Sequence, residues 1–468
     1  MPHQKKVTFI GGGSYQWVPV LFRDIAVNRH LQNIRFVLHD IDYQRNQEMA
    51  DVCQTVVKKL DSTISVETED DLDSALSNAD TVILCISTGG LDAMEHDIEI
   101  PKKYGIYQPV GDSTGPGGIS RTLRNVPVVT DIARRMENLC PEAWLINLTN
   151  PMNQLVRAVQ QTSRIKVIGL CHEYMSFMNT AQHLLGIKSW DRETSATIAG
   201  INHFAWITQL NVNGEDGLRL LQDRMSGHDL KDDTHGAKAI HPSHTLSENQ
   251  IKSSLLDIYG AMPYPGDRHL AEFFPYFLSK KNRYGAEYGV KLTSIHDRRV
   301  TWMGWYRDRV ALWTNHDPDS VPREPSQESL APILAALISN GPVTIQPATM
   351  PNQGQVANLP LHSSVETLVT FTNGMASPHA SGSLPPAVHG LVLKHCLNQD
   401  LMVEAAIEGS RTKVLQAMLA DPLNNNNEFR EIEALVDELL QANAALLPQF
   451  FPNAVRNGSH RADILVEA

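Results

Sequence analysis

The first 195 residues alternate short apolar runs with stretches of helical periodicity. The apolar runs predict strands at Val7–Ile10, Ile34–Asp40, Thr81–Ser87, Ala143–Leu148 and Ile165–Leu170. Helical spacing predicts helices over Trp17–Val27, Met49–Leu60 and Val128–Leu139. Strands that alternate with helices are typical of a parallel sheet covered by helices on both faces. We therefore predict a Rossmann-like, doubly wound α/β domain over residues 1–195.

The pattern changes after residue 195. Ile198–Val212 predicts strand pairs rather than further strand–helix units. The last third is mostly helical, with long patterns at Ser326–Ile338, Pro386–Glu408 and Glu428–Ala445. We predict a second domain over residues 196–468, α+β and largely helical, that serves substrate binding and oligomerisation.

Between these parts, residues 213–249 are polar and predict a surface excursion. It contains His235, His241 and His244 among Asp, Lys and Ser. Three histidines suggest a metal site, but isolated histidines in such a polar segment are more typical of solvated loop residues.

The composition narrows the possible function classes. The 468 residues include 40 Lys and Arg against 52 Asp and Glu, which gives a formal net charge of −12. A nucleic-acid binder needs a basic face to displace counterions, so this balance argues against one. No apolar run approaches the roughly 20 residues of a membrane span, and the N-terminus shows no signal-peptide pattern. We expect a soluble, cytoplasmic enzyme without nucleic-acid or membrane partners.

A glycine-rich turn, Gly11-Gly12-Gly13-Ser14, lies between the first strand and the first helix. Glycines permit the close approach of a pyrophosphate, and the helix N-terminus supplies free N–H groups. Because Gln16 stands where a third glycine is usual, the turn alone is no more typical of a nucleotide site than of a plain turn. Asp40 ends the second strand, where a carboxylate can bind ribose hydroxyls and repel a 2′-phosphate. Together Gly11, Gly13, Ser14 and Asp40 predict an NAD site.

The segment Cys171-His172-Glu173 ends a later strand. A thiolate there is a soft ligand for a divalent metal, although a lone buried cysteine usually serves packing. His203 supplies a second candidate ligand. One cysteine and one histidine leave open the coordination positions that a catalytic metal needs. The five cysteines are scattered and form no CxxC pair, so no disulfide framework or structural zinc site is predicted.

Other polar loops offer candidate sugar contacts and acid–base groups. Asp112 lies in a glycine-rich segment, Gly111–Gly118, that suits a loop against a cofactor or sugar. Asn150 can bind a sugar hydroxyl, although an Asx turn before a proline explains it as well. Tyr259 and Asp267 lie in a loop rich in ionisable groups, for which a surface salt-bridge cluster is the alternative.

These motifs, in this order, resemble glycoside hydrolase family 4, whose members are NAD- and manganese-dependent glycosidases. The likeness extends over nearly the whole chain. Besides the glycine turn, it includes His39-Asp40-Ile41-Asp42, Gly111-Asp112, Thr149-Asn150-Pro151, Cys171-His172-Glu173, Asn202-His203, Gly266-Asp267-Arg268-His269, Pro351–Gln355 and Ala420–Leu423.

The resemblance implies a redox–elimination mechanism with NAD and Mn²⁺ as cofactors. The sugar C3 hydroxyl is oxidised, a base removes the C2 proton, the C1 oxygen leaves with acid help, water adds, and C3 is reduced again. The likeness implies that Cys171 and His203 bind the metal. It also implies Asp267 as the C2 base, with Tyr259 as its alternative, and His172 as the acid.

The resemblance further implies that Asn150 and Asp112 contact sugar hydroxyls, with Asp112 among the catalytic groups. Cys-His-Glu is similar to the branch that cleaves unphosphorylated α-glycosides. We expect an α-glucoside, with α-galactosides, α-glucuronides, α-galacturonides and a sulfonated glucoside as alternatives. Tyr174 stands where the family has a small aliphatic residue, which predicts an altered subsite beside His172.

Two other readings stay open. An ordinary NAD-dependent dehydrogenase of the 2-hydroxyacid type would accumulate NADH and would not need Cys171 as a metal ligand. A non-catalytic sugar or nucleotide sensor would bind NAD without turning over a glycoside. The family likeness also implies a homodimer or homotetramer, for which the helical C-terminal third offers an interface.

Overall fold

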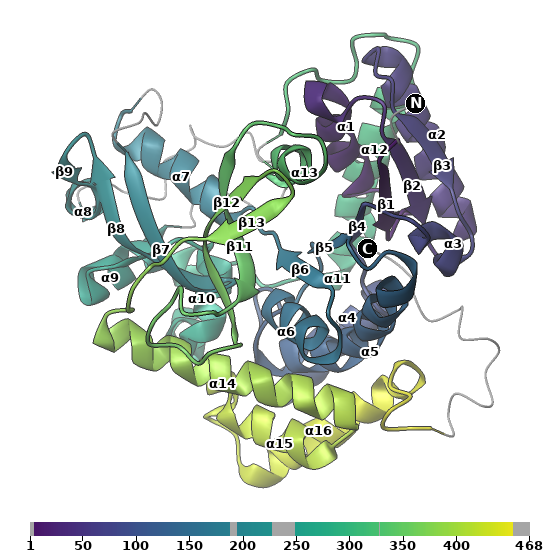
Figure 1. The fold of residues 1–468 in the computed structure, drawn as a ribbon. Coiled ribbons are helices and arrows are strands. Elements are labelled where there is room, and N and C mark those ends of the chain that lie inside the picture. The colour runs from purple at the N-terminus through teal and green to yellow at the C-terminus, as the bar shows by residue number, and fades with distance from the viewer. Residues whose placement is uncertain (1–3, 188–193, 227–248, 327, 453–468) are drawn as a thin grey trace.

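In the computed structural model, one mixed β-sheet of 13 strands runs through the molecule (Figure 1). The structure describes residues 4–187, 194–226, 249–326 and 328–452, so His235, His241 and His244 lie outside the described residues. Among the helices described, none combines the length and the apolar surface needed to cross a lipid bilayer.

One half of this sheet is parallel, with the strand order β3-β2-β1-β4-β5-β6. Its strands are β1 (Lys6–Ile10), β2 (Arg35–His39), β3 (Ser65–Thr68), β4 (Thr81–Leu84), β5 (Trp144–Asn147) and β6 (Lys166–Gly169). Phe9, Val82 and Ile146 are fully buried because helices cover both faces of these strands. This strand order is that of the doubly wound dinucleotide-binding fold, so the predicted Rossmann-like half is confirmed.

Helices cover the two faces of the parallel half in two apolar clusters. One cluster takes in α1 (Val18–Val27), α2 (Tyr43–Lys59) and α13 (Leu330–Ile338). The larger cluster takes in α5 (Gly115–Leu139), α6 (Met152–Thr162), α14 (Pro386–Glu408), α15 (Arg411–Ala420) and α16 (Phe429–Ala442). The C-terminal helices therefore pack against the N-terminal half, below α5 and α6 in Figure 1.

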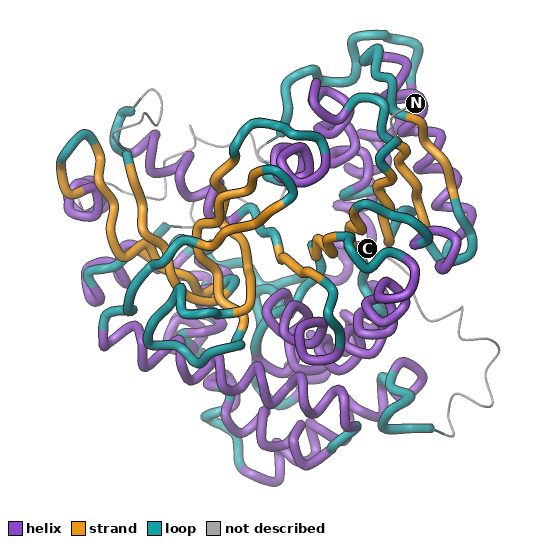
Figure 2. The backbone as a smooth tube through the Cα atoms, viewed as in Figure 1, coloured by secondary structure: helices purple, strands orange, loops and turns teal. Residues whose placement is uncertain are grey.

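The other half of the sheet is antiparallel and continues from β6 (Figure 2). It contains β7 (Ser195–Ile201), β8 (Phe204–Val212), β9 (Glu215–Asp216), β10 (Met262–Pro263), β11 (Thr344–Pro351), β12 (Ser364–Thr372) and β13 (Met375–Pro378). Strand β11 joins β6 through the single residue pair Thr349 and Gly169. Strand β12 joins β7 through the single pair Glu366 and Gly200. The predicted strand pair is confirmed as β7 and β8, whereas β11 to β13 lie in the part predicted to be mostly helical.

The remaining elements connect these strands and helices. They are α3 (Leu72–Leu76), α4 (Gly90–Lys103), α7 (Glu173–Leu184), α8 (Gly217–Ser226), α9 (Gln250–Tyr259), α10 (Asp267–Phe273), α11 (Ile295–Asp297), α12 (Met303–Thr314), a π-helix η5 (Arg298–Trp302) and the 3₁₀ turns η1 (Arg29–Leu31), η2 (Pro275–Leu278), η3 (Lys280–Asn282), η4 (Ala286–Tyr288), η6 (Pro422–Asn424) and η7 (Ala444–Leu446).

Two local predictions need correction. The described part of the polar excursion contains the helix α8, not only loop. The glycine-rich segment is not a loop throughout, because α5 begins at Gly115. A Cβ on Gly117 would lie 2.7 Å from the carbonyl oxygen of Gly111, and a Cβ on Gly118 would lie 2.5 Å from the carbonyl carbon of Ser113. These glycines let the helix begin directly against the loop that carries Asp112.

Candidate active site

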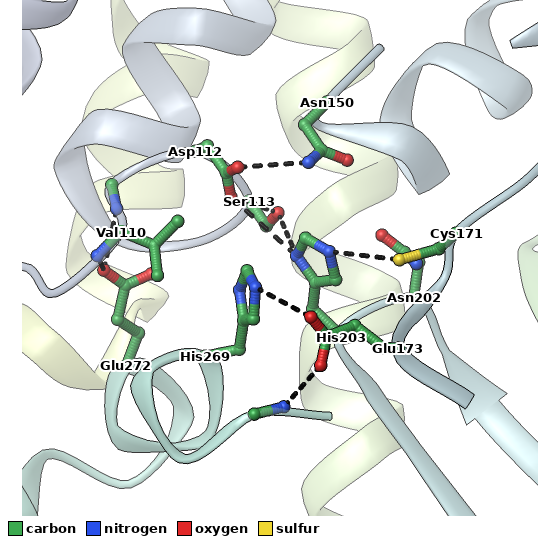
Figure 3. A network of polar contacts seen from close by, with 12 residues as sticks. Val110, Asp112, Ser113, Asn150, Cys171, Glu173, Asn202, His203, His269 and Glu272 are labelled. Carbon is green, nitrogen blue, oxygen red and sulfur yellow. Dashed lines mark hydrogen bonds and ion pairs between the residues drawn. The ribbon is translucent and has the colours of Figure 1, made fainter. Parts of the chain in front are cut away.

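Five of the predicted site residues, Asp112, Asn150, Cys171, His172 and His203, line a cavity of about 270 Å³ at the carboxyl ends of the parallel strands. The loops after β4, β5 and β6 line it with Cys85, Asn150 and Cys171. His203, in the turn between β7 and β8, and His269, in the first turn of α10, enter from the antiparallel half. The two halves of the sheet therefore build one site (Figure 3).

A second cavity, of about 580 Å³, adjoins the first, and Ile86 and Ser87 line both. Gly11 and Asp40 lie on its wall. Binding of ligands across the carboxyl edge of such a sheet is the rule for doubly wound folds. A dinucleotide in the larger cavity could therefore extend to the smaller one.

The glycine turn is shaped by the strand beside it. Gly11 has φ +95°, and a Cβ there would lie 1.8 Å from the carbonyl oxygen of Cys85. Gly13 donates its N–H to Asp40 at 2.8 Å, and the Ser14 hydroxyl accepts a main-chain N–H at the start of α1. Burial raises the pKa of Asp40, and the main-chain N–H groups that it accepts oppose this shift. The four predicted cofactor residues thus meet at the ends of β1 and β2.

Cys171 and His203 come together although they are distant in sequence. The Sγ of Cys171 lies 3.6 Å from Nε2 of His203. Nδ1 of His203 lies 2.8 Å from the hydroxyl of Ser113, which leaves Nε2 directed at the thiol. Burial raises the pKa of the Cys171 thiol well above its usual value, and the carboxylates of Glu173 and Glu366 add to this effect. Without a bound cation the thiol is therefore held in its protonated form.

Two further groups complete a cluster that could hold a cation. Ligand atoms of Asp112, His203 and His269 all lie within 4.8 Å of one another, and the rings of His203 and His269 are 3.7 Å apart. Burial would raise the pKa of Asp112, but the charges of His203, His269 and Arg121 outweigh it and lower that pKa to about 2. Burial and His203 lower the pKa of His269 to about 3. At neutral pH the cluster therefore offers a carboxylate and a neutral imidazole.

Asn150 faces this cluster from the end of β5. Its side-chain N–H donates to Asp112 at 3.0 Å. Its side-chain oxygen is buried and has no hydrogen-bond partner among the described residues. Such a group is usually satisfied by a ligand or water, so Asn150 has acceptor capacity for a sugar hydroxyl.

The turn that carries His203 rests on a buried carboxylate. Glu366 of β12 accepts hydrogen bonds from the side chain of Asn202 at 3.0 Å and from the Thr349 hydroxyl at 3.1 Å, and it also accepts from the Tyr264 hydroxyl. His203 itself has φ +63°, an uncommon backbone conformation for a residue with a side chain. The Glu366 network therefore holds in place a turn whose backbone conformation is uncommon.

His172 lines the cavity and lies between two carboxylates. Its Nε2 is 3.7 Å from Glu173, and its Nδ1 is 3.7 Å from Glu328. Glu173 accepts the main-chain N–H of Gly266 at 2.6 Å, and its other oxygen lies 3.8 Å from Nε2 of His269. Glu173 thus ties His172 to the turn that carries His269.

Two predicted acid–base residues are not brought to the cavity. The Asp267 carboxylate is fully buried and accepts the main-chain N–H groups of Ile251 and Lys252, where it closes the first turn of α9. Tyr259 packs edge-on against Trp206, with ring centroids 5.5 Å apart, and does not line the cavity. These placements do not favour either residue as a base that touches the sugar.

Several site residues were not singled out from the sequence. Ser113 and His269 lie in motifs that were recognised, but only the fold shows that both contact His203. Glu366 and Arg298 belong to segments without any motif, and no sequence signal points to them. A buried carboxylate in a β-strand is the only feature that could have drawn attention to Glu366.

Comparisons with known proteins agree with this architecture. The model of the family 4 glycosyl hydrolases matches residues 6–187, and the model of the C-terminal domain of the same family matches residues 198–424. An alpha-galacturonidase from Thermoanaerobacter italicus is 33% identical over 93% of this chain and 95% of its own length. An alpha-galactosidase from Bacillus subtilis is 31% identical over 95% of this chain and 100% of its own length.

Solved structures show the same fold. The crystal structure of a putative glucosidase from Bacillus subtilis has a TM-score of 0.84, with 32% identity over 93% of this chain and 100% of that chain. A 6-phospho-alpha-glucosidase from gut microorganisms, in complex with NAD and Mn²⁺, has a TM-score of 0.77 with 18% identity, covering 95% of this chain and 99% of that chain. The second likeness concerns the fold alone.

Proposed function

Because this chain belongs to glycosyl hydrolase family 4, we propose that it hydrolyses an unphosphorylated α-glycoside with NAD and a divalent cation, Mn²⁺. The observation that carries the proposal is the meeting of Cys171 and His203 in a cavity that adjoins the glycine turn. The alpha-galacturonidase and alpha-galactosidase relatives support the α-linkage. The fold relative in complex with NAD and Mn²⁺ supports the cofactors.

The residues present fit a divalent cation. Cys171 Sγ and His203 Nε2 lie 3.6 Å apart, so one divalent cation would be held by both, and a thiolate and an imidazole are donors that such cations accept. The Ser113 hydroxyl on the other ring nitrogen supplies the outer contact that typically orients a ligating histidine.

The residues also fit NAD. The glycine turn leaves main-chain N–H groups at the start of α1 for a pyrophosphate. Asp40 at the end of β2 is placed for ribose hydroxyls, and its charge disfavours a 2′-phosphate.

NAD supplies reversible oxidation at the sugar C3, and the cation supplies charge stabilisation for the C2 and C3 oxygens. The chain's own groups orient the sugar and move protons. Asn150 accepts a sugar hydroxyl on its free oxygen, and Asp112 holds the amide in place. His172, oriented by Glu173 and Glu328, donates a proton to the leaving C1 oxygen.

For removal of the C2 proton we propose His269 in place of Asp267 or Tyr259. His269 is the imidazole of the Gly266–His269 turn that lines the cavity, whereas Asp267 points at α9. Its Nε2 lies 3.8 Å from Glu173, so a proton taken from C2 would be stabilised by that carboxylate. Cys171 and His203 then remain as the protein ligands of the cation.

The test is a panel of aryl α-glycosides that differ at C4 and C6, assayed with and without NAD and Mn²⁺. We expect cleavage of at least one member that requires both additions, with deuterium from the solvent at C2 of the product. Cleavage that persists after exhaustive removal of NAD and cations, or the absence of cleavage with both bound, would overturn the proposal. Steady accumulation of NADH would instead favour a dehydrogenase.

We also propose a homo-oligomer. Val300, Trp305 and Leu312 on η5 and α12 are about half exposed, and contact with another copy would cover them. Light scattering on the purified protein tests this, with a dimer or tetramer expected. A monomer at all concentrations would contradict it.

A further inference from the structure

Three arginine side chains line the cavity that holds the Cys171–His203 pair. They come from three separate segments: Arg121 from α5, Arg268 from α10 and Arg298 from η5. A cavity for a neutral sugar has no evident need for three guanidinium groups. Their hydrogen bonds show which of them has a structural task.

Two of the three arginines have partners in the protein. Arg268 donates to the carbonyl oxygen of Pro109 and to the hydroxyl of Thr293 at 3.1 Å. Arg121 donates from Nε to the carbonyl oxygen of Asn150 at 3.1 Å. These bonds hold the loops that carry Asp112 and Asn150 in place.

Arg298 has no such partner. Its Nε is buried and makes no hydrogen bond, and within the described part of the chain the side chain forms no ion pair. The guanidinium lies over the ring of Trp302, with its central carbon 4.5 Å from the ring centroid. Stacking covers the face of the guanidinium and leaves the donors at its edge available in the plane.

The backbone around Arg298 is also unusual. Arg298–Trp302 form a π-helix between α11 and α12, and such single turns recur at functional sites because they re-aim side chains at a cost in stability. Burial and the charge of Arg268 lower the pKa of Arg298 to about 10, so the group remains a cation at neutral pH. Arg298 is partly exposed, but its Nε is buried without a hydrogen-bond partner among the described residues. Such a cation is suited to an anion that the described residues do not supply.

The acids that share the cavity are already engaged. Asp112 accepts from Asn150 and from the Ser113 hydroxyl, and Glu173 accepts from Gly266. The third acid, Glu328, lies 3.7 Å from Nδ1 of His172. Asp112 and Arg298 line the same cavity, which places the arginine beside the cluster where the sugar ring would lie. The missing anion is therefore expected on the substrate.

We propose that Arg298 binds the carboxylate of a uronic acid, so that the glycoside cleaved is an α-uronide. This inference rests on the proposed α-glycosidase function and adds the residue that selects the substrate. A planar guanidinium matches a planar carboxylate with two parallel hydrogen bonds. A phosphate dianion would need more free donors than one stacked arginine provides.

The experiment measures the binding of free sugars, so that it does not depend on turnover. Calorimetry compares galacturonate with galactose, and glucuronate with glucose, on the protein loaded with NAD and Mn²⁺. We expect at least one uronate to bind roughly 10- to 100-fold more tightly than its neutral counterpart, which is the range for a hydrogen bond to a charged group. In Arg298→Met this preference is expected to disappear, and in Arg298→Lys it is expected to be partly kept.

Arg299→Met is the matched control. Arg299 is the next residue of the same π-helix, but it is partly exposed and pairs with Asp92 and with Glu95 at the surface. Its replacement is expected to leave the uronate preference unchanged. Arg298→Met is expected to keep the NAD affinity and the Tm of the wild type, because the buried Nε has no hydrogen bond to lose within the described part of the chain.

The outcomes separate this inference from the proposed function. A uronate preference that Arg298→Met abolishes supports it, even if no glycoside is cleaved. Equal binding of uronates and neutral sugars by the wild type, or a preference that Arg298→Met retains, overturns it while α-glycoside cleavage can stand. Tighter binding of glucose 6-phosphate than of either uronate would also overturn it, because the anion would then be a phosphate.

Discussion

Replacing Glu366 by glutamine removes the carboxylate on which the His203 turn rests. Glu366 is 3% exposed and accepts from three donors, on Asn202, Thr349 and Tyr264. Glutamine keeps one acceptor oxygen but adds an amide N–H₂ that faces the remaining donors. At least one donor therefore loses its partner in a site that water does not reach.

The expected loss follows from these contacts. A hydrogen bond to a charged group contributes about 1.5–3 kcal/mol, and breaking a buried charged arrangement by changing one partner costs about 3–5 kcal/mol. We predict that Glu366→Gln lowers the free energy of unfolding by about 1.5–5 kcal/mol, which spans these two ranges. Because the turn positions His203, the affinity for Mn²⁺ should fall about 10- to 100-fold, as is typical for outer contacts of a metal ligand.

Urea unfolding without metal measures the first effect, and calorimetric titration of the folded protein with Mn²⁺ measures the second. Thr367→Val is the matched control. Thr367 is the next residue of β12, is fully buried, and has a hydroxyl without a hydrogen-bond partner in the described structure. Its replacement should leave the Mn²⁺ affinity unchanged and the stability equal or higher.

The Mn²⁺ affinity and the free energy of unfolding together distinguish a role of Glu366 in positioning His203 from a general contribution to stability. If Glu366→Gln lowers stability but binds Mn²⁺ as tightly as the wild type, the carboxylate does not position His203. If it changes neither quantity, the hydrogen-bond reasoning itself is refuted.

Three further predictions concern other parts of the site. Gly11→Ala should abolish NAD binding, measured by quenching of tryptophan fluorescence, because the new Cβ would overlap the carbonyl oxygen of Cys85; binding within about threefold of the wild type would contradict this. Asp267→Asn should lower the free energy of unfolding by about 1–2 kcal/mol and leave kcat within about threefold, because asparagine can accept only one of the two main-chain N–H groups that the carboxylate accepts at the start of α9. Loss of turnover at unchanged stability would restore Asp267 as the base. Burial raises the pKa of Glu272 to about 8, although hydrogen bonds from the main-chain N–H groups of Val110 and Gly111 oppose this shift. Between about pH 5 and pH 8 the folded chain therefore holds a proton that the unfolded chain releases. Stability should therefore fall as pH rises through that window, and urea unfolding of Glu272→Gln should show a shallower slope; identical slopes would show that Glu272 ionises normally.

The parallel half of the sheet could be predicted because each of its sequence patterns lies within a single strand or helix. The buried strands read as continuous apolar runs, and α2 shows one apolar stripe in the part that begins at Met49. The glycine turn and Asp40 lie at the ends of adjacent parallel strands, so the sheet order alone brings them together. Cys171 and His203 were paired by residue type and family likeness, and the structure places them in contact.

The antiparallel strands and part of the active site depend on contacts between distant segments, which no local sequence pattern reveals. The strands β11 and β12 are held by pairing with β6 and β7, which lie more than a hundred residues earlier, so they were missed in a part with strong helical signals. Asp267 looked available because its sequence neighbours are glycine, arginine and histidine, yet its partner is the start of α9. Arg298 is distinguished by its π-helix, by its contact with Trp302 and by a buried Nε without a partner in the described structure, and all three exist only in the folded chain.

The central claim is that the thiolate of Cys171 and the imidazole of His203 hold one divalent cation in the cavity beside the nucleotide cleft. Cobalt(II) substitution tests it directly, because a thiolate bound to Co²⁺ gives a charge-transfer absorption in the near ultraviolet. The wild type and Cys85→Ser, a control in the same cavity, should show this band, and Cys171→Ser should lack it. A band that survives in Cys171→Ser, or that never forms in the wild type, would contradict the account.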